Sequence, residues 1–330
     1  MNDNLVSVKN VSVEFDYQEN FLSKKQKIQA VKNVSLDIKK KSFLGLVGES
    51  GSGKTTLGKA ILGANKISSG QVIFHDDHTD YDLANINKKE LKEYRKKAQL
   101  IFQDPYAALS PRMTVRDIIA EPLEVMKITK SREETDERVR DIASKCRLNL
   151  EHLRRYPHAF SGGQRQRISI ARSLVSYPKF IVADESVAAL DVSIQADILN
   201  LLKSLQKDLD LTYLFISHDL SVVAHTCDEV AVMYLGHIVE QAPSRELFTN
   251  PRHPYTKALL SSIPSIDPDD QKKAIELKGE IPSAMNPPSG CVFRTRCPNP
   301  THDCKEGHIE MGLIEVSPDH WVDQCCVNCG

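Results

Sequence analysis

The chain has 330 residues, of which 41% are hydrophobic and 26% are charged, so it can bury one large core or two smaller ones. Its formal net charge of −1 excludes a general attraction to nucleic acid or to an anionic membrane surface. No apolar run approaches the roughly 20 residues that cross a bilayer, and the start, Met1 to Asn4, lacks the basic-then-apolar pattern of a signal peptide. We therefore expect a cytosolic protein that reaches a membrane only through a partner.

The first segments of the chain combine strand patterns with one glycine-rich loop. Residues 5–14 and 34–38 alternate apolar and polar side chains, which is typical of half-buried strands. Residues 42–48 have the composition of a buried strand that runs into the loop, and residues 55–62 that of the helix after it. This order, strand then loop then helix, is the context in which a glycine-rich loop can bind phosphate.

The rest of the chain up to about residue 243 alternates between helical and strand patterns. Charged residues at helical spacing, with few strand signals, fill residues 84–98 and 114–155. Two buried parallel strands then flank an amphipathic helix, and a hairpin turning at Leu235-Gly236 follows. These later segments are residues 180–184, 193–207 and 211–217, and the hairpin arms 230–234 and 237–240.

This order predicts an α/β protein made of a core and an extension. The core covers residues 1–250 and is interrupted by a helical insertion at about 104–168. From residue 251 the composition shifts to proline, so we expect residues 251–330 to form an irregular extension.

The glycine-rich loop matches the pattern G-x-x-x-x-G-K-[ST], which indicates a nucleotide phosphate site. Its backbone N–H groups would wrap the β-phosphate, the Lys54 ammonium would neutralise β and γ oxygens, and the Thr55 hydroxyl would bind Mg²⁺. The predicted ATP-binding residues of this segment are Gly48, Ser50, Gly51, Ser52, Gly53, Lys54, Thr55 and Thr56.

Four polar residues at the ends of apolar segments complete the predicted catalytic site. Asp184 ends a strand and can hold Mg²⁺, and Glu185 can act on the attacking water as a general base. His218 follows another strand and would lie beside the γ-phosphate. Gln103 precedes Asp104-Pro105, where we expect a hinge between two lobes to begin. The Gln103 side chain can therefore join the network of Mg²⁺ and water when the two lobes close.

The run Ser161-Gly162-Gly163-Gln164 forms a second anion site at the start of a helical segment. It has no obvious use in a lone subunit, since the phosphate loop of the chain already serves its own nucleotide. We therefore expect an ATPase that works only as a face-to-face pair.

In order and spacing, these motifs over residues 5–245 resemble those of the ATP-binding subunits of ABC transporters. The resemblance implies an ABC-type fold with an antiparallel β subdomain and an inserted helical subdomain. It also implies that two segments contact the ATP of a partner subunit. They are the run Ser161, Gly162, Gly163 and Gln164, and the loop Ala189-Leu190-Asp191 with Asp191 as its contact residue.

Finer matches resemble the oligopeptide/dipeptide (and nickel) branch, and most of all the second, F-type, of its two ATPases. They include the segments 156–160, 191–196, 233–237, 250–256 and 286–291. The branch implies an importer for peptides, with nickel or another small solute as the alternative.

Three departures from the family pattern stand out. Ser186 replaces the usual proline after the catalytic glutamate, and Ala188 replaces a serine or threonine. The aromatic residue that stacks on adenine aligns best with Phe15, while Tyr17 is the alternative, because an insertion at 16–29 blurs the alignment.

Six of the eight cysteines follow residue 290, which suggests a local metal site rather than a secreted disulfide framework. The spacing of Cys291, Cys297, Cys304 and Cys325 is too loose for the usual zinc pairs, and it suits a [4Fe–4S] cluster. Related peptide-transporter ATPases carry such cysteines, which favours the cluster. Cys326 or Cys329 can replace Cys325, and zinc, free thiols or disulfides remain alternatives. Cys146 and Cys227 are expected to be structural.

The resemblance further implies a set of partners and a location. The direct partners are a homologous ABC ATPase, which forms a heterodimer with this chain, and two membrane permease subunits contacted near residues 106–112. An extracytoplasmic solute-binding protein would act indirectly, and no nucleic acid is expected as a partner. The chain would then lie peripherally on the cytoplasmic face of the membrane. The competing hypotheses are a non-transport ABC protein and a nucleotide-binding regulatory subunit with little turnover.

Overall fold

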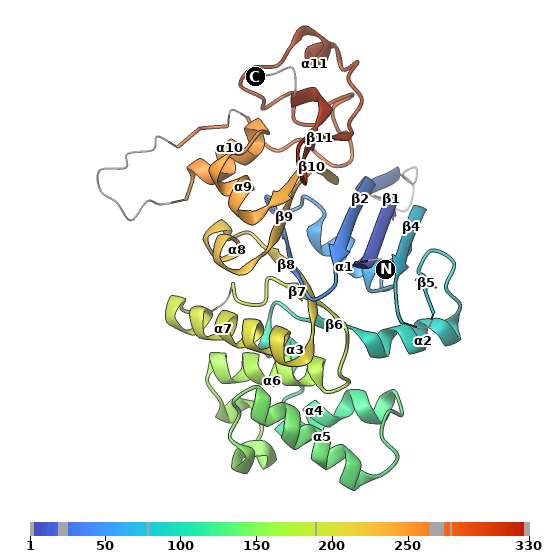
Figure 1. The fold of residues 1–330 in the computed structure, drawn as a ribbon, viewed down its shortest axis with the longest axis vertical. Coiled ribbons are helices and arrows are strands. Elements are labelled where there is room, and N and C mark those ends of the chain that lie inside the picture. Colours follow the sequence, from blue (N-terminus) through green and yellow to red (C-terminus); the bar gives the residue numbers. More distant parts are fainter. Residues whose placement is uncertain are drawn as a thin grey trace.

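The computed structural model describes residues 3–18, 26–77, 79–188, 190–263, 274–277 and 279–326. Two β-sheets lie side by side, a group of helices covers one end of the molecule, and the C-terminal extension covers the other (Figure 1). Within these ranges, none of the helices has both the length and the apolar character needed to cross a bilayer.

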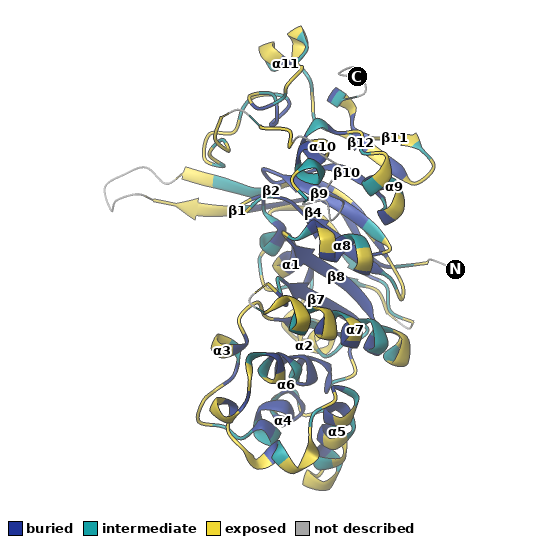
Figure 2. Cartoon of the chain, turned by 90° about the vertical axis from the view of Figure 1, so that its left-hand side faces the viewer, coloured by how far each residue is buried: buried dark blue, intermediate teal, exposed yellow. Residues whose placement is uncertain are grey.

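The larger sheet forms the centre of the core. Its strand order is β11-β12-β10-β9-β3-β8-β7-β6, and the neighbours from β9 to β6 run parallel. Strands β3, β7 and β8 are buried along their whole length, as their continuous apolar runs predict (Figure 2). Their bounds are Phe43–Val47 (β3), Ala98–Ile101 (β6), Phe180–Asp184 (β7), Thr212–Ser217 (β8), Glu229–Tyr234 (β9) and His237–Pro243 (β10).

Helices join the strands of this sheet. The predicted helix after the glycine loop and the predicted amphipathic helix are both present, and the hairpin β9–β10 turns at Leu235-Gly236 as expected. The helices are Lys54–Ile61 (α1), Val192–Leu209 (α7) and Leu220–Thr226 (α8).

The second sheet is antiparallel, in the order β2-β1-β4-β5. The outer ends of β1 and β2 project from the body of the molecule and are exposed (Figure 2). A helix, α2, follows this sheet and begins with a capping box between Asn87 and Glu90. The bounds are Asn4–Tyr17 (β1), Gln26–Lys39 (β2), Ser69–Phe74 (β4), Tyr81–Asp82 (β5) and Lys88–Lys97 (α2).

The expected helical insertion is a bundle whose last helix, α6, packs against α3, α4, α5 and α7. It lies at the lower end of the molecule in Figure 1. The insertion begins directly after β6, and α6 continues to Leu174. Its helices are Pro105–Ala108 (α3), Val115–Val125 (α4), Arg132–Lys145 (α5), the short turns Leu150–Arg154 (η1) and Pro157–Ala159 (η2), and Gly162–Leu174 (α6).

The C-terminal extension is more regular than its proline content predicts. Strand β12 pairs antiparallel with β10, through Glu240 and Val322, so the extension adds two strands to the main sheet. The expectation of an irregular extension was wrong there, because residues 313–323 contain strand-forming Ile, Val and Trp residues on both sides of a turn at Pro318-Asp319. The core ends with the short helix Ser244–Thr249 (α9), and the elements of the extension are Pro254–Ser261 (α10), His302–Glu306 (α11), Leu313–Ser317 (β11), His320–Asp323 (β12) and Gln324–Cys326 (η3).

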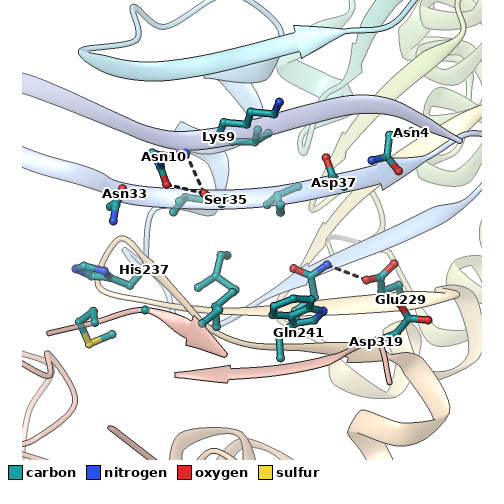
Figure 3. Close-up of a pocket in the computed structure, with 18 of the residues that line it drawn as sticks. Asn4, Lys9, Asn10, Asn33, Ser35, Asp37, Glu229, His237, Gln241 and Asp319 are labelled. Carbon is teal, nitrogen blue, oxygen red and sulfur yellow. Dashed lines mark hydrogen bonds between the residues drawn. The ribbon is translucent and has the colours of Figure 1, made fainter. Parts of the chain in front are cut away.

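A cavity of about 560 Å³ lies where this hairpin approaches β1 and β2 (Figure 3). Asn33, Ser35 and Asp37 line one wall, and His237 and Gln241 lie opposite (Figure 3). None of the residues from Gly48 to Thr55 lines it, so this cavity is separate from the glycine-rich loop.

Candidate active site

The glycine-rich loop is fixed between two strands by close backbone contacts. Gly48 has φ 149°, and a Cβ there would lie 2.1 Å from the carbonyl oxygen of Met233 in β9. Gly53 has φ 104°, and its Cβ would lie 2.3 Å from the carbonyl oxygen of Ala30 in β2. Only glycine fits either place, so both sheets shape the loop.

The Lys54 ammonium lies buried inside this loop. It donates to the carbonyl oxygens of Gly48 at 2.8 Å and Glu49 at 2.9 Å, and to the Ser52 hydroxyl at 3.4 Å. Burial lowers the pKa of Lys54, while the nearby carboxylates of Glu185, Asp184 and Glu49 act in the opposite direction. A phosphate oxygen is a stronger partner for an ammonium than a neutral carbonyl, so the loop presents a cation that suits phosphate.

Thr55 and Asp184 bring two oxygen ligands together. The Thr55 hydroxyl donates to Asp184 Oδ1 at 3.0 Å. Burial raises the pKa of Asp184, because a carboxylate at the end of β7 loses most of its hydration. A hydroxyl and a carboxylate side by side fit the oxygen preference of Mg²⁺, and a bound cation would offset the burial of this charge.

Gln103, Glu185 and His218 meet at the carboxyl ends of the neighbouring strands β6, β7 and β8. The Gln103 amide donates to Glu185 Oε2 at 2.7 Å, and His218 Nδ1 lies 3.4 Å from Glu185 Oε1. Glu185 adopts the left-handed region at φ 47°, and its N–H donates to the carbonyl oxygen of Ile216 at 2.9 Å. Gln103 contacts Glu185 rather than Thr55 or Asp184, so its part in a Mg²⁺ site stays a prediction.

The second anion motif begins helix α6. Ser161 caps the helix, and Ser161 and Gln164 form a capping box, each accepting a hydrogen bond from the other's backbone N–H. Helix α6 packs against α3, α4, α5, α7 and β6, whereas α1 packs against β1, β2, β7 and β8. The helix that follows the motif and the helix that follows the glycine-rich loop therefore pack against different sets of elements.

The two glycines of this motif differ in their surroundings. A Cβ on Gly163 would lie 2.6 Å from Cγ2 of Ile194 in α7, whereas one on Gly162 would lie 3.8 Å from Leu190. Gly163 is thus needed for the contact between α6 and α7. Asp191 caps α7 without a side-chain hydrogen bond to the helix, and Ala189 of the same motif lies outside the described residues.

The candidate adenine-stacking residues both lie at the outer end of β1. Phe15 is 43% exposed and Tyr17 40%, so neither is a core residue. They are two positions apart on one strand and therefore share a face of the sheet, which leaves both as candidates.

Contacts to the glycine-rich loop from the C-terminal extension escaped the sequence reasoning. Glu49 donates its backbone N–H to the Tyr255 hydroxyl at 2.8 Å, and its carboxylate accepts two hydrogen bonds from Arg296. Tyr255 lies 206 positions and Arg296 247 positions after Glu49, and no pattern in the sequence connects segments so far apart.

The cysteines of the extension gather in one buried region. Cys291, Cys304 and Cys325 are buried, and Cys297 and Cys326 are partly buried. Cys325 Sγ lies 3.2 Å from Cys291 Sγ and 3.5 Å from Cys326 Sγ. Burial raises the pKa of Cys297, and Cys291 and Cys304 are close enough to raise it further. Cys329 lies outside the described residues.

A histidine adjoins these thiols. One ring nitrogen of His253 and the sulfurs of Cys325 and Cys326 lie within 4.8 Å of one another. His253 Nδ1 accepts the N–H of Tyr255 at 3.1 Å, while the buried Nε2 has no hydrogen-bond partner among the described residues. Burial lowers the pKa of His253 to about 3, so the ring is neutral. A neutral imidazole beside several thiols is a donor set that suits a metal.

In comparison with known proteins, one family matches part of the core and a second family matches a segment that reaches into the C-terminal extension. Residues 31–188 match the family "ABC transporter", and residues 239–304 match "Oligopeptide/dipeptide transporter, C-terminal region". The chain is 47% identical to the putative oligopeptide transport ATP-binding protein YkfD of Bacillus subtilis, over 96% of this chain and 94% of the relative. It is 45% identical to the oligopeptide transport ATP-binding protein OppF of the same organism, over 98% and 96% of the two chains.

A solved structure shares the fold of the core. The dimeric post-hydrolysis state of the ATP-binding cassette MJ0796, bound to ADP and Pi, is similar with a TM-score of 0.62 and 30% identity. The match covers 73% of this chain and 99% of that one.

Proposed function

The chain belongs to the oligopeptide transport ATP-binding proteins of the ABC transporter family and is an ATPase, and from this premise we propose that it powers the import of peptides. The observation that carries the ATP hydrolysis in this proposal is the contact of Gln103 and His218 with Glu185, beside the pair Thr55 and Asp184. A general base, two polar groups that orient it and a cation site are the parts that hydrolysis of a bound nucleotide requires.

In the proposed reaction, ATP binds with its phosphates on the loop from Gly48 to Thr56. Lys54 would exchange its carbonyl partners for β and γ oxygens, while Thr55 and Asp184 would hold Mg²⁺. When bound, Mg²⁺ supplies charge neutralisation on the phosphates. Glu185 would accept a proton from water as the water oxygen attacks the γ-phosphorus, and the bond to the ADP oxygen breaks.

The proposed active form is a head-to-tail dimer. The N-terminus of α6 at Ser161 to Gln164 would bind the γ-phosphate of a partner's ATP, since helix N-termini favour anions. Asp191 would lie in the same interface. We propose a homologous, non-identical ATPase as the partner, as the resemblance to two-ATPase peptide systems implies.

The proposed membrane partner is a pair of permease subunits, which places the chain peripherally on the cytoplasmic face. A cavity of about 270 Å³ between β6, α4 and α6 carries exposed apolar side chains, Phe102 and Val125 among them. Nearby, Tyr106 is exposed, with the Arg165 guanidinium 4.1 Å from its ring centre. Exposed apolar groups at this surface suit a cytoplasmic helix of a permease. An extracytoplasmic binding protein would act only through that permease.

The proposed solute is a peptide, because residues 239–304 match the oligopeptide/dipeptide transporter region. Nickel or another small solute is the alternative. Identifying the solute that copurifies with the assembled complex would separate the two, and a metal without peptide would contradict the first.

We also propose a [4Fe–4S] cluster in the extension. The proposal is supported by the common location of Cys291, Cys297, Cys304, Cys325 and Cys326 in the extension, where four of these residues could supply the thiolate ligands. A bound cluster would supply an inorganic cross-link between distant segments. Protein purified without oxygen should be brown and contain iron; colourless protein with zinc, or with neither metal, would contradict the cluster.

The proposed activity is tested by Glu185→Gln in the assembled complex. The partner ATPase should carry the equivalent substitution, so that only the site of this chain contributes turnover. We expect the ATPase rate to fall by about 100-fold or more, the usual contribution of a general base. An unchanged rate would instead support a regulatory subunit that binds nucleotide without hydrolysing it.

A further inference from the structure

Glu49 places a negative charge in the loop that must receive phosphate. Its side chain is partly exposed, and its charge acts on the Lys54 ammonium, raising the pKa of that group against the effect of burial. A carboxylate here would repel the phosphates of ATP and compete with them for Lys54. The loop therefore needs a group that neutralises Glu49.

Arg296 is placed to supply that neutralisation. Its Nη1 donates to Glu49 Oε2 at 2.7 Å and its Nη2 to Oε1 at 3.2 Å, a two-point contact that the planar guanidinium matches well. The Arg296 side chain is only 8% exposed, and its guanidinium carbon lies 5.9 Å from the Tyr234 ring centre. The hydrogen bonds to Glu49 raise the pKa of Arg296, so the guanidinium stays protonated.

Tyr255 fixes the backbone of the same residue. Its hydroxyl accepts the Glu49 N–H at 2.8 Å, and the buried ring packs against Tyr234 and Phe293 at centroid distances of 4.7 and 5.6 Å. Tyr255 belongs to α10, and Phe293 and Arg296 lie between Cys291 and Cys297. The extension thus holds Glu49 through both its side chain and its amide.

We propose that Arg296 and Tyr255 are positioning residues for ATP binding, acting through Glu49, so that the C-terminal extension completes the nucleotide site of its own chain. This inference rests on the proposed ATP site. Arg296 cancels the charge that would oppose the phosphates, and Tyr255 fixes the start of the loop before the nucleotide arrives. Both effects act on binding, so they change the KM for ATP and leave kcat nearly constant.

The test compares MgATP dissociation constants of full-length chains by calorimetry, and KM and kcat in the assembled complex. Arg296→Gln should weaken ATP binding about ten-fold, the size expected for one partly screened charge interaction. Arg296→Lys, which keeps the charge, should weaken it less. The double variant Glu49→Gln/Arg296→Gln should return towards wild type, because no charge is then left unneutralised. Tyr255→Phe should raise KM by a smaller factor.

Arg294→Gln is the matched control. Arg294 belongs to the same extension, and its guanidinium donates hydrogen bonds to Ser289, Cys304 and Lys305, which all belong to the extension too. The proposal is overturned if Arg296→Gln binds ATP as Arg294→Gln does, or if the double variant binds as weakly as Arg296→Gln alone. A merely structural role for Arg296 gives the second result.

Two further variants keep the test decisive. If Arg296→Gln does not fold, Glu49→Gln alone should bind MgATP as tightly as wild type or more tightly, and weaker binding overturns the proposal. Lys54→Ala tests the proposed ATP site itself. If that variant binds ATP normally, the assigned site is wrong, whatever Arg296 does.

Discussion

The Gln103 side-chain amide donates to Glu185 Oε2 at 2.7 Å, so the predicted catalytic base is already bound to the residue at the start of the helical subdomain. Gln103 follows β6 and precedes α3, the first helix of that subdomain. A shift of the helices relative to the core would therefore change the hydrogen bonding of Glu185.

Gln103→Ala should lower kcat for ATP about ten-fold and leave KM almost unchanged. The substitution removes a group that orients the base, and positioned proton-transfer groups contribute mainly to the chemical step. Steady-state ATPase assays on the assembled complex measure both constants. A raised KM at constant kcat would mean that Gln103 serves nucleotide binding instead.

Gly163→Ala should destabilise the protein by about 1–3 kcal/mol, because the added methyl would overlap Ile194 of α7 and force α6 away. Gly162→Ala, at the adjacent position, is the control, since its methyl has room beside Leu190. Urea unfolding of both variants measures the difference. Equal free energies of unfolding would show that α6 and α7 do not need this close contact.

His237 should make stability depend on pH between about 4 and 6.5. Burial, together with the nearby charge of Lys32, lowers the pKa of His237 from 6.5 to about 4, so in this window the unfolded chain binds a proton that the folded chain does not. Stability from the neutral ring is thus full above pH 6.5 and is lost as the pH falls towards 4.

The contribution of His237 is measured as the difference between wild type and His237→Gln in urea unfolding at several pH values. The wild type should lose up to about 1.4 kcal/mol per pH unit more than the variant within this window. Parallel curves for the two proteins would contradict the assignment.

Glu240→Ala should loosen the C-terminal extension. The fully buried Glu240 carboxylate accepts the backbone N–H groups of Arg252 and His253 and a bond from His320 Nε2 at 2.8 Å. Removing it leaves these donors buried without partners, at a cost of about 3 kcal/mol or more. Limited proteolysis should then cleave after residue 250 faster than in wild type. Arg294→Gln should not have this effect.

The core elements were predictable because their signals are local. The continuous apolar runs of β3, β7 and β8 indicated buried parallel strands, and the glycine pattern between β3 and α1 indicated the loop. Asp184, Glu185 and His218 meet because parallel strands deliver their carboxyl ends to one edge of the sheet.

Contacts between distant segments were not predictable in the same way. Arg296 looks like any charged residue in a proline-rich tail, and nothing near it in the sequence points to Glu49. The pairing of β12 with β10 was hidden because the proline content of the extension outweighed two short segments with strand-forming residues. In each case the partner is set by tertiary packing, which local patterns do not encode.

The pairing of β10 with β12 also has a consequence for solubility. Without β12, the unpaired backbone groups of β10 would form an open sheet edge, which can recruit a strand from another molecule. At this edge of the larger sheet the outermost strand is instead β11, which has five residues and carries the charged side chain of Glu315. The extension therefore caps the sheet against edge-to-edge aggregation, and a chain ending at residue 250 should self-associate where the full chain does not.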